Sequence, residues 1–215
     1  MFAADDDHYI VQEETWSPDG KLGVTKPVSE FSEAIKDPKN RLVEVKTGRV
    51  IADLEGDTAW NRMNHGSTVT QWSADGSLLH WWVEGKWSAM AQVIVKLTDT
   101  KVVWQKDLVP ICWKTILQKT QAADPKGYAR EKEQNKGSGS AYPEGFTVDV
   151  RVDDDQVPLK LPLKVRVDLT SDPKDLHGSS KIDAWLNAVL SEDGKLTFGT
   201  FKLERRPDLK NNWAG

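Results

Sequence analysis

A β-hairpin is predicted by the stretch Gln71-Trp72-Ser73-Ala74-Asp75-Gly76-Ser77-Leu78-Leu79-His80-Trp81-Trp82. Its centre is Asp75-Gly76, a pair that tolerates the positive φ of hairpin turns, and apolar and aromatic residues stand on both sides. The same phrase, Ser-x-Asp-Gly-x-Leu, occurs at residues 17–22 and again at residues 191–196. We therefore expect a chain that uses one kind of hairpin repeatedly.

The first half of the chain contains two similar cycles of predicted strands. In the first cycle, strands are expected at 8–16, 21–26, 41–46 and 49–54, and in the second at 68–73, 78–84, 89–97 and 101–108. Equivalent serines, Ser17 and Ser73, are 56 positions apart. An internal repeat of this length is typical of stacked β units.

The first cycle resembles a known family of repeats. The residues that carry the resemblance are Trp16-Ser17-Pro18-Asp19-Gly20-Lys21-Leu22 and the later Leu42-Val43-Glu44-Val45-Lys46-Thr47-Gly48-Arg49-Val50. They look like a blade of the WD40-like β-propellers of bacterial exported proteins. The resemblance covers about residues 9–109 as two units and implies four-stranded antiparallel sheets. Two copies are too few for a closed propeller, which usually has four or more blades, so the units are expected to pack face to face or to pair with the C-terminal strands.

The middle of the chain, residues 110–140, predicts a short helix and a flexible linker. Pro110 suits a first helical turn, and Trp113, Ile116 and Leu117 share one helical face. The segment 124–127, Asp-Pro-Lys-Gly, should end the helix, and Gly-Ser-Gly-Ser at 137–140 is typical of a linker.

Residues 141–206 predict a C-terminal antiparallel β unit. Apolar residues alternate with polar ones from Phe146 to Val152 and from Leu161 to Leu169, as in sheets with one buried face. A slip of the apolar phase after Phe198 predicts a bulge near Gly199. The predicted fold is therefore all-β, with antiparallel sheets of propeller-blade-like four-stranded units, a C-terminal antiparallel β unit and one short helix between them.

Composition excludes several classes of function. The net charge of −4 is small, which argues against nucleic acid as the main partner. No apolar run approaches the ~20 residues that cross a bilayer. The single cysteine, Cys112, permits no internal disulfide and no thiolate zinc site, and its apolar neighbourhood predicts a buried structural thiol.

The N-terminal residues predict an exported protein, periplasmic or secreted. Met1-Phe2-Ala3-Ala4, which ends in two small residues, precedes Asp5-Asp6-Asp7, as at the start of a mature chain whose signal peptide has been removed. The alternative is an ordinary frayed terminus of a cytoplasmic protein.

Tryptophans supply the candidate ligand-binding residues, since the chain holds ten of them. Trp81 and Trp82 must face opposite sides of a strand, so we expect at least one of the two to be exposed, and Trp87 lies close by in sequence. Exposed indoles can stack on sugar rings, whereas most of the other tryptophans are interpreted as core residues. His65 lies in a polar loop that could line a cleft.

No catalytic or metal constellation is predicted. The four histidines are scattered, and the acidic runs 5–7 and 153–155 lack the Asp-x-Asp-x-Asp-Gly spacing of calcium loops. The sequence has no Gly-x-Ser-x-Gly elbow and no phosphate loop, so no cofactor is expected.

The sequence thus favours a non-catalytic, exported binding or scaffold module with a protein partner. The alternatives are a carbohydrate-binding module that uses its exposed tryptophans and, as a third candidate, an unrecognised hydrolase with loop carboxylates. Open sheet edges would also allow homo-oligomers.

Overall fold

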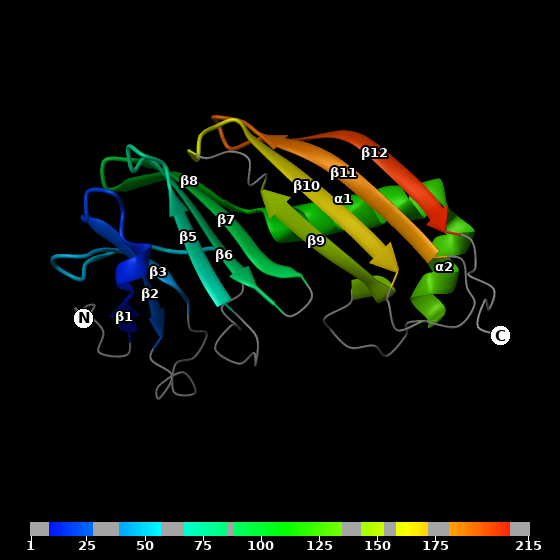
Figure 1. The fold of residues 1–215 in the computed structure, drawn as a ribbon, viewed down its shortest axis with the longest axis horizontal. Coiled ribbons are helices and arrows are strands. Elements are labelled where there is room, and N and C mark those ends of the chain that lie inside the picture. The colour runs from blue at the N-terminus through cyan, green and yellow to red at the C-terminus, as the bar shows by residue number, and fades with distance from the viewer. Residues whose placement is uncertain are drawn as a thin grey trace, which may run out of the picture.

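Three four-stranded antiparallel sheets follow one another along the chain (Figure 1). The computed structural model describes residues 9–27, 39–56, 67–85, 88–134, 143–152, 158–171 and 181–206. The predicted all-β class with antiparallel sheets is confirmed, but the first strand, expected at 8–16, covers only Tyr9–Val11 and is followed by a 3-10 turn at Glu13–Thr15. His65, Trp87 and both acidic runs, 5–7 and 153–155, lie outside the described residues.

Each sheet is a meander in which the strands stand in chain order. The first sheet consists of β1 (Tyr9–Val11), β2 (Leu22–Pro27), β3 (Arg41–Glu44) and β4 (Val50–Asp53). The second consists of β5 (Ser67–Trp72), β6 (Leu78–Glu84), β7 (Ala89–Thr98) and β8 (Lys101–Asp107). The third consists of β9 (Phe146–Val152), β10 (Leu163–Ser171), β11 (Lys181–Leu190) and β12 (Leu196–Arg206). The helices are α1 (Leu108–Ala123), α2 (Pro125–Gln134) and single 3-10 turns at Glu13–Thr15 and Pro143–Gly145.

The three Ser-x-Asp-Gly segments form similar turns. The glycines have φ of 70° at Gly20, 70° at Gly76 and 76° at Gly194, a region that residues with a Cβ rarely adopt. In each turn the serine hydroxyl donates a hydrogen bond to the aspartate two residues later. The third turn is one residue tighter, because the backbone N–H of Ser191 bonds to the carbonyl of Lys195, four residues on, whereas in the first two turns the partner is five residues on.

The second sheet lies between the other two and contributes side chains to an apolar cluster on each of its faces. Leu79, Trp81 and Val83 of β6 pack with residues of the first sheet in one apolar cluster. Their neighbour Leu78 and Ile94 of β7 belong to a second cluster, which continues through α1 and the inner face of the third sheet. Alternation along β6 therefore sends successive side chains into two different cores.

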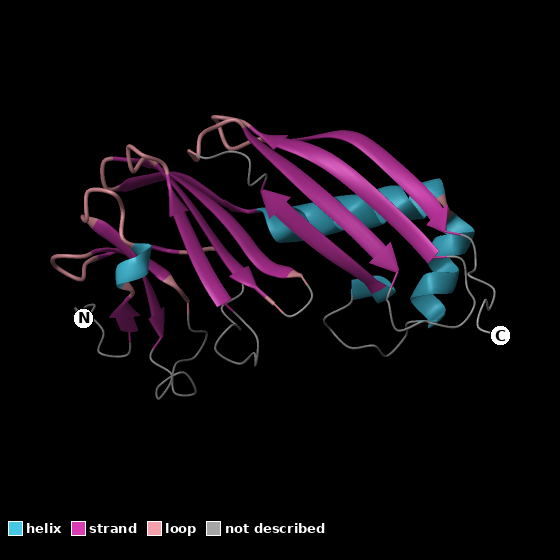
Figure 2. Cartoon of the chain, viewed as in Figure 1, coloured by secondary structure: helices cyan, strands magenta, loops and turns pink. Residues whose placement is uncertain are grey.

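Helix α1 lies behind the third sheet and covers its apolar face (Figures 1 and 2). It follows β8 without a loop. Asp107 ends the strand and caps the helix, since its carboxylate accepts hydrogen bonds from the N–H groups of Val109 and Gln92, both at 3.1 Å. The thiol of Cys112 lies in the same core, so its predicted burial is confirmed, and this burial raises its pKa to about 12.

A second helix, α2, occupies part of the stretch for which the sequence predicted a linker. Asp124 ends α1 and starts α2: its carboxylate accepts from the N–H of Gly127 at 3.0 Å and its carbonyl from Tyr128 at 2.9 Å. The Tyr128 ring stacks on Phe146 with the ring centres 5.0 Å apart. The local cap at Asp124 and the contact of Tyr128 with the distant Phe146 together stabilise a polar helix that the sequence analysis did not predict.

The predicted bulge is present in β12. Leu186 pairs with Phe201 and Ala188 with Phe198, so β12 holds one extra residue at the position of Gly199.

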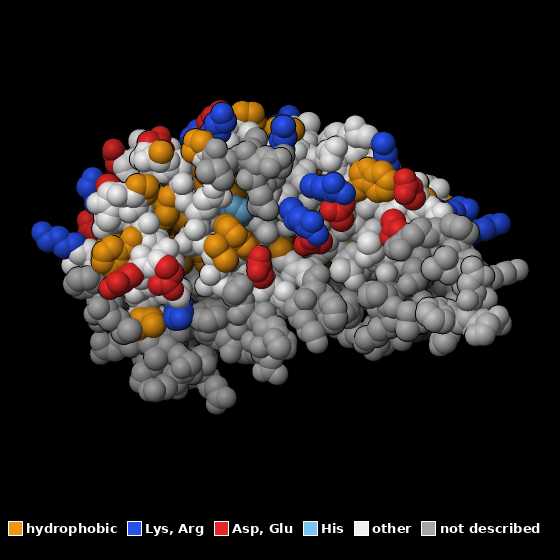
Figure 3. All heavy atoms as spheres, viewed as in Figure 1, with side chains coloured by type: hydrophobic (Ala, Val, Ile, Leu, Met, Phe, Trp, Pro, Cys, Tyr) orange, Lys and Arg blue, Asp and Glu red, His pale blue; other side chains and the backbone are white. Residues whose placement is uncertain are grey.

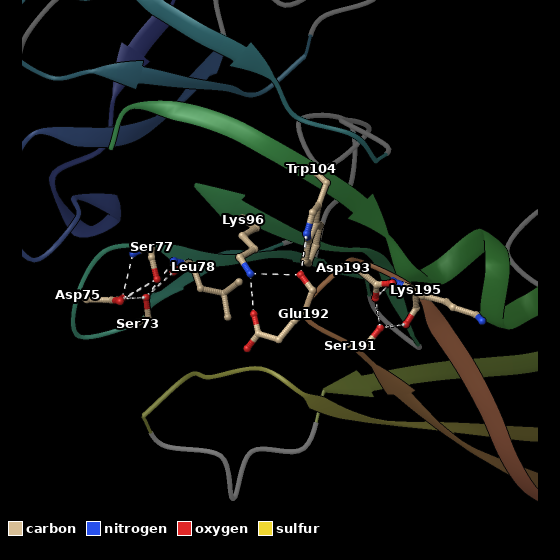
Figure 4. A network of polar contacts seen from close by, with 10 residues as sticks. All are labelled: Ser73, Asp75, Ser77, Leu78, Lys96, Trp104, Ser191, Glu192, Asp193 and Lys195. Atoms are coloured by element: carbon tan, nitrogen blue, oxygen red, sulfur yellow. Dashed lines mark hydrogen bonds and ion pairs between the residues drawn. The ribbon is translucent and has the colours of Figure 1, made fainter. Parts of the chain in front are cut away.

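The third Ser-x-Asp-Gly turn joins the third sheet to the second (Figure 4). The carbonyl of Glu192 accepts hydrogen bonds from the Trp104 indole N–H and from the ammonium of Lys96, both at 3.2 Å. The Glu192 carboxylate also pairs with Lys96 at 2.5 Å. Gly194 lies so close to the Trp104 ring that a Cβ there would be 2.9 Å from its Cδ2. The turn is therefore a contact between sheets as well as a connection between strands.

Candidate functional site

A cleft of about 400 Å³ opens between the second sheet and strand β9 of the third. Its lining comes from β6, β7, β9 and the connection between β6 and β7, and the polar and aromatic residues are His80, Trp82, Glu84, Ser88, Gln92, Asp149 and Arg151. Clefts between packed units are common ligand sites when aromatic surface and a few polar groups converge in them. Figure 3 shows hydrophobic side chains and a histidine beside acidic and basic side chains on this face of the molecule.

The indole of Trp82 is half-buried and held in place from two sides. Its ring stacks on that of His80 with the ring centres 4.4 Å apart and an angle of 28° between the planes. Its N–H donates to the carboxylate of Glu84 at 3.3 Å. Fixing the ring before a ligand arrives lowers the entropy cost of binding.

His80 lies behind Trp82 and is almost fully buried. Its Nε2 is 2.6 Å from Oε1 of Gln92, and since an amide oxygen only accepts, Nε2 carries the proton. Burial lowers the pKa of His80 to about 4, despite this hydrogen bond, so the ring is neutral near pH 7. A neutral, buried imidazole supports the Trp82 ring and is poorly placed to act as a base.

The opposite wall of the cleft is formed by polar residues of β9. The guanidinium of Arg151 pairs with the carboxylate of Asp149 at 2.5 Å. Both residues stand on the outward face of the strand, opposite to Val148, Val150 and Val152. The pair offers donors and acceptors side by side next to the aromatic wall.

The sequence-predicted residues separate in the structure. Trp82 lines the cleft, whereas Trp81 is 1% exposed and packs in the core between the first and second sheets, where no ligand reaches it. His65 and Trp87 lie outside the described residues. Of the pair Trp81 and Trp82, one is thus accessible, as strand alternation predicts.

Sequence reasoning missed Gln92, Asp149 and Arg151. Alternation did place the two β9 residues on the wet face of their strand, opposite Phe146 and Val148. Nothing in the sequence indicates that β9 lies beside the second sheet. The proximity of Asp149 and Arg151 to Trp82 could therefore not be predicted.

A second cavity of about 460 Å³ lies between the first two Ser-x-Asp-Gly turns and the β7–β8 hairpin. Hydrogen bonds from Lys21 and Ser17 lower the pKa of Asp19 to about 2, and bonds from Ser73 and Ser77 do the same for Asp75. Both carboxylates accept hydrogen bonds from residues of their own turns and thereby stabilise those turns. Across the described ranges, no three His, Cys, Asp or Glu side chains are grouped so that they could hold a metal ion.

Among the helices that the structure describes, none has the length and apolar character needed to cross a membrane.

Comparison with known proteins identifies no relative: no family model, curated protein or solved structure matches this chain.

Proposed function

We propose that this protein is a non-catalytic binding module that holds a carbohydrate in the cleft between the second and third sheets. The observation that carries the proposal is the fixed, half-exposed indole of Trp82 facing the Asp149–Arg151 pair. The apolar face of a sugar ring matches an aromatic plane, and its hydroxyls match paired donors and acceptors. The neutral, buried His80 favours binding over acid–base chemistry in this cleft.

The test is a titration of the folded protein with soluble glycans, followed by intrinsic tryptophan fluorescence and by calorimetry. We expect a saturable change that Trp82→Ala weakens at least about tenfold, the usual effect of removing a central aromatic anchor. Trp82→Phe keeps the aromatic face and should retain part of the affinity. Val103→Ala, at an exposed position on the distant strand β8, is the matched control and should bind as the wild type does. Wild-type protein that binds none of the glycans would refute the proposal.

A protein partner is the second candidate, favoured by exposed valines on edge strands of the second sheet. Val103 on β8 is 56% exposed and Val69 on β5 is 38% exposed. Edge strands with apolar side chains can pair with another chain, including a second copy of this one. Light scattering over a range of concentrations tests self-association, which Val103→Lys should reduce; a monomer at all concentrations would remove the second copy as the partner.

We also propose that the protein is exported and that its first two sheets are related to the blades of WD40-like propellers. Both rest on the sequence: the residues at 2–7 for export, and the Ser-Pro-Asp-Gly-Lys and Thr-Gly turns for the blades. Four-stranded meanders in chain order are the arrangement that such blades have. Fractionation of cells that express the full-length protein would test export, and recovery in the cytoplasm alone would contradict it.

A further inference from the structure

The third sheet has one open face, and that face continues the wall of the cleft. Helix α1 covers the other face, where the apolar side chains of β9 to β11 are buried (Figure 1). On the open face Asp149 and Arg151 belong to the cleft and to the sheet surface at once. Acidic, basic and hydrophobic side chains are mixed over this surface in Figure 3.

Strand register places a second tryptophan in line with the cleft. Trp185 of β11 pairs with Asp168 of β10, and Asp168 pairs with Asp149 of β9. Two strand spacings separate the Cα atoms of Trp185 and Asp149, which is about 10 Å. The row leads from the cleft, where Trp82 lies, across two carboxylates to the partly exposed indole of Trp185.

The next row carries two arginines with the same spacing. Arg166 stands directly opposite Arg151, and Asp168 directly opposite Asp149, so like charges face each other across the strands. Such neighbours repel, but each arginine pairs with the aspartate on its own strand, at 2.5 Å on β9 and 2.9 Å on β10. The four side chains form a square in which the two planar donors are neighbours along one side and the two carboxylate acceptors are neighbours along the opposite side.

The charges around this row help to define the ligand that it suits. Among the outward positions whose side chains the structure describes, four are basic and four are acidic: Arg151, Lys164, Arg166 and Lys202, and Asp149, Asp168, Asp183 and Glu204. Two more basic residues, Lys181 and Arg206, pair at one end of β11 and β12, away from the row. A balanced face does not attract polyanions or polycations over distance. Paired donors and acceptors between two aromatic rings suit a neutral chain of hydroxyl groups, since each hydroxyl both donates and accepts.

We propose that the binding surface extends from Trp82 in the cleft to Trp185 on the open sheet, and that its ligand is a neutral linear oligosaccharide several sugars long. This inference rests on the proposed function and deepens it by fixing the length and charge of the ligand. Lys202 is exposed, with its ammonium 5.7 Å from the centre of the Trp185 ring, so it can move aside when a sugar stacks there.

The test compares short and long sugars of the same chemistry, cellobiose with cellohexaose and xylobiose with xylohexaose, by calorimetry. For at least one series we expect the hexamer to bind at least tenfold more tightly than the dimer. Trp185→Ala should remove most of that gain and leave dimer binding unchanged, whereas Trp82→Ala should weaken both. The matched control is Val189→Ala, an exposed position on the same strand but in another row, which should change neither.

The outcomes separate the two proposals. Equal affinity for dimer and hexamer, or full hexamer affinity in Trp185→Ala, would overturn the extended surface while the cleft at Trp82 stands. Absence of wild-type binding to all four sugars would overturn both. Tighter binding to a sulfated oligosaccharide of the same length than to either neutral hexamer would overturn the neutral ligand.

Discussion

The contact between the third turn and the second sheet makes a sharp prediction for Gly194→Ala. An alanine at a φ of 76° costs about 1–2 kcal/mol of unfolding free energy because the left-handed region crowds a Cβ. Its methyl group would also be 2.9 Å from the Trp104 ring, and such overpacking adds about 1–3 kcal/mol. We therefore expect a total destabilisation of about 3 kcal/mol.

The chain supplies its own control in Gly20→Ala. Gly20 has nearly the same φ, 70°, in the equivalent turn, but no atom lies within 4 Å of the position of its Cβ. This variant should lose only the backbone part, about 1–2 kcal/mol. Urea denaturation followed by circular dichroism measures both values, and in a Trp104→Ala background the cost of Gly194→Ala should fall to that of Gly20→Ala. Equal costs in the wild-type background would show that the turn does not press on Trp104.

Three further predictions concern stability. Burial lowers the pKa of His80 from 6.5 to about 4, so between these pH values the unfolded chain binds a proton that the folded chain does not. The free energy of unfolding should therefore fall by on the order of 3 kcal/mol as the pH drops from about 6.5 to 4. Denaturation at several pH values measures this loss, which should be smaller in His80→Gln. Ser73→Ala should lower the free energy of unfolding by about 1–2 kcal/mol, because it leaves the N–H of Leu78 unpaired. Ser191→Ala should lower it by less, because that serine is partly exposed. Equal losses in the two variants would contradict this difference between the turns. Asp107→Ala removes the cap of α1 together with the partner of the buried Gln92 N–H, so thermal melts should show a loss of about 2 kcal/mol or more, and an unchanged melting temperature would contradict it.

Local sequence rules predicted most of the β structure because they act between neighbouring residues. Asp-Gly pairs fixed the turns at Gly20, Gly76 and Gly194, and alternation identified the buried face of the third sheet. The bulge at Gly199 was visible as a change of phase. Each of these signals is contained within one hairpin.

Features that depend on packing between distant segments were not predictable. Helix α2 is polar and forms where Tyr128 meets Phe146, a contact that no local rule anticipates. Alternation required Trp81 and Trp82 to face opposite sides, but only the placement of the sheets decides which one is buried. The cleft itself depends on β9 lying beside the second sheet, so the sequence could supply Trp82 but not the wall that faces it.

The strand order has a consequence for how the protein folds during synthesis. Every strand pairing within the described residues joins strands that are consecutive along the chain, so each sheet can close as soon as its last strand leaves the ribosome. The first sheet then presents Leu22, Val24 and Leu42 to water until the second sheet arrives to cover them. Until residues 67–107 have been translated, this apolar surface of the nascent chain is open to aggregation and to chaperone binding.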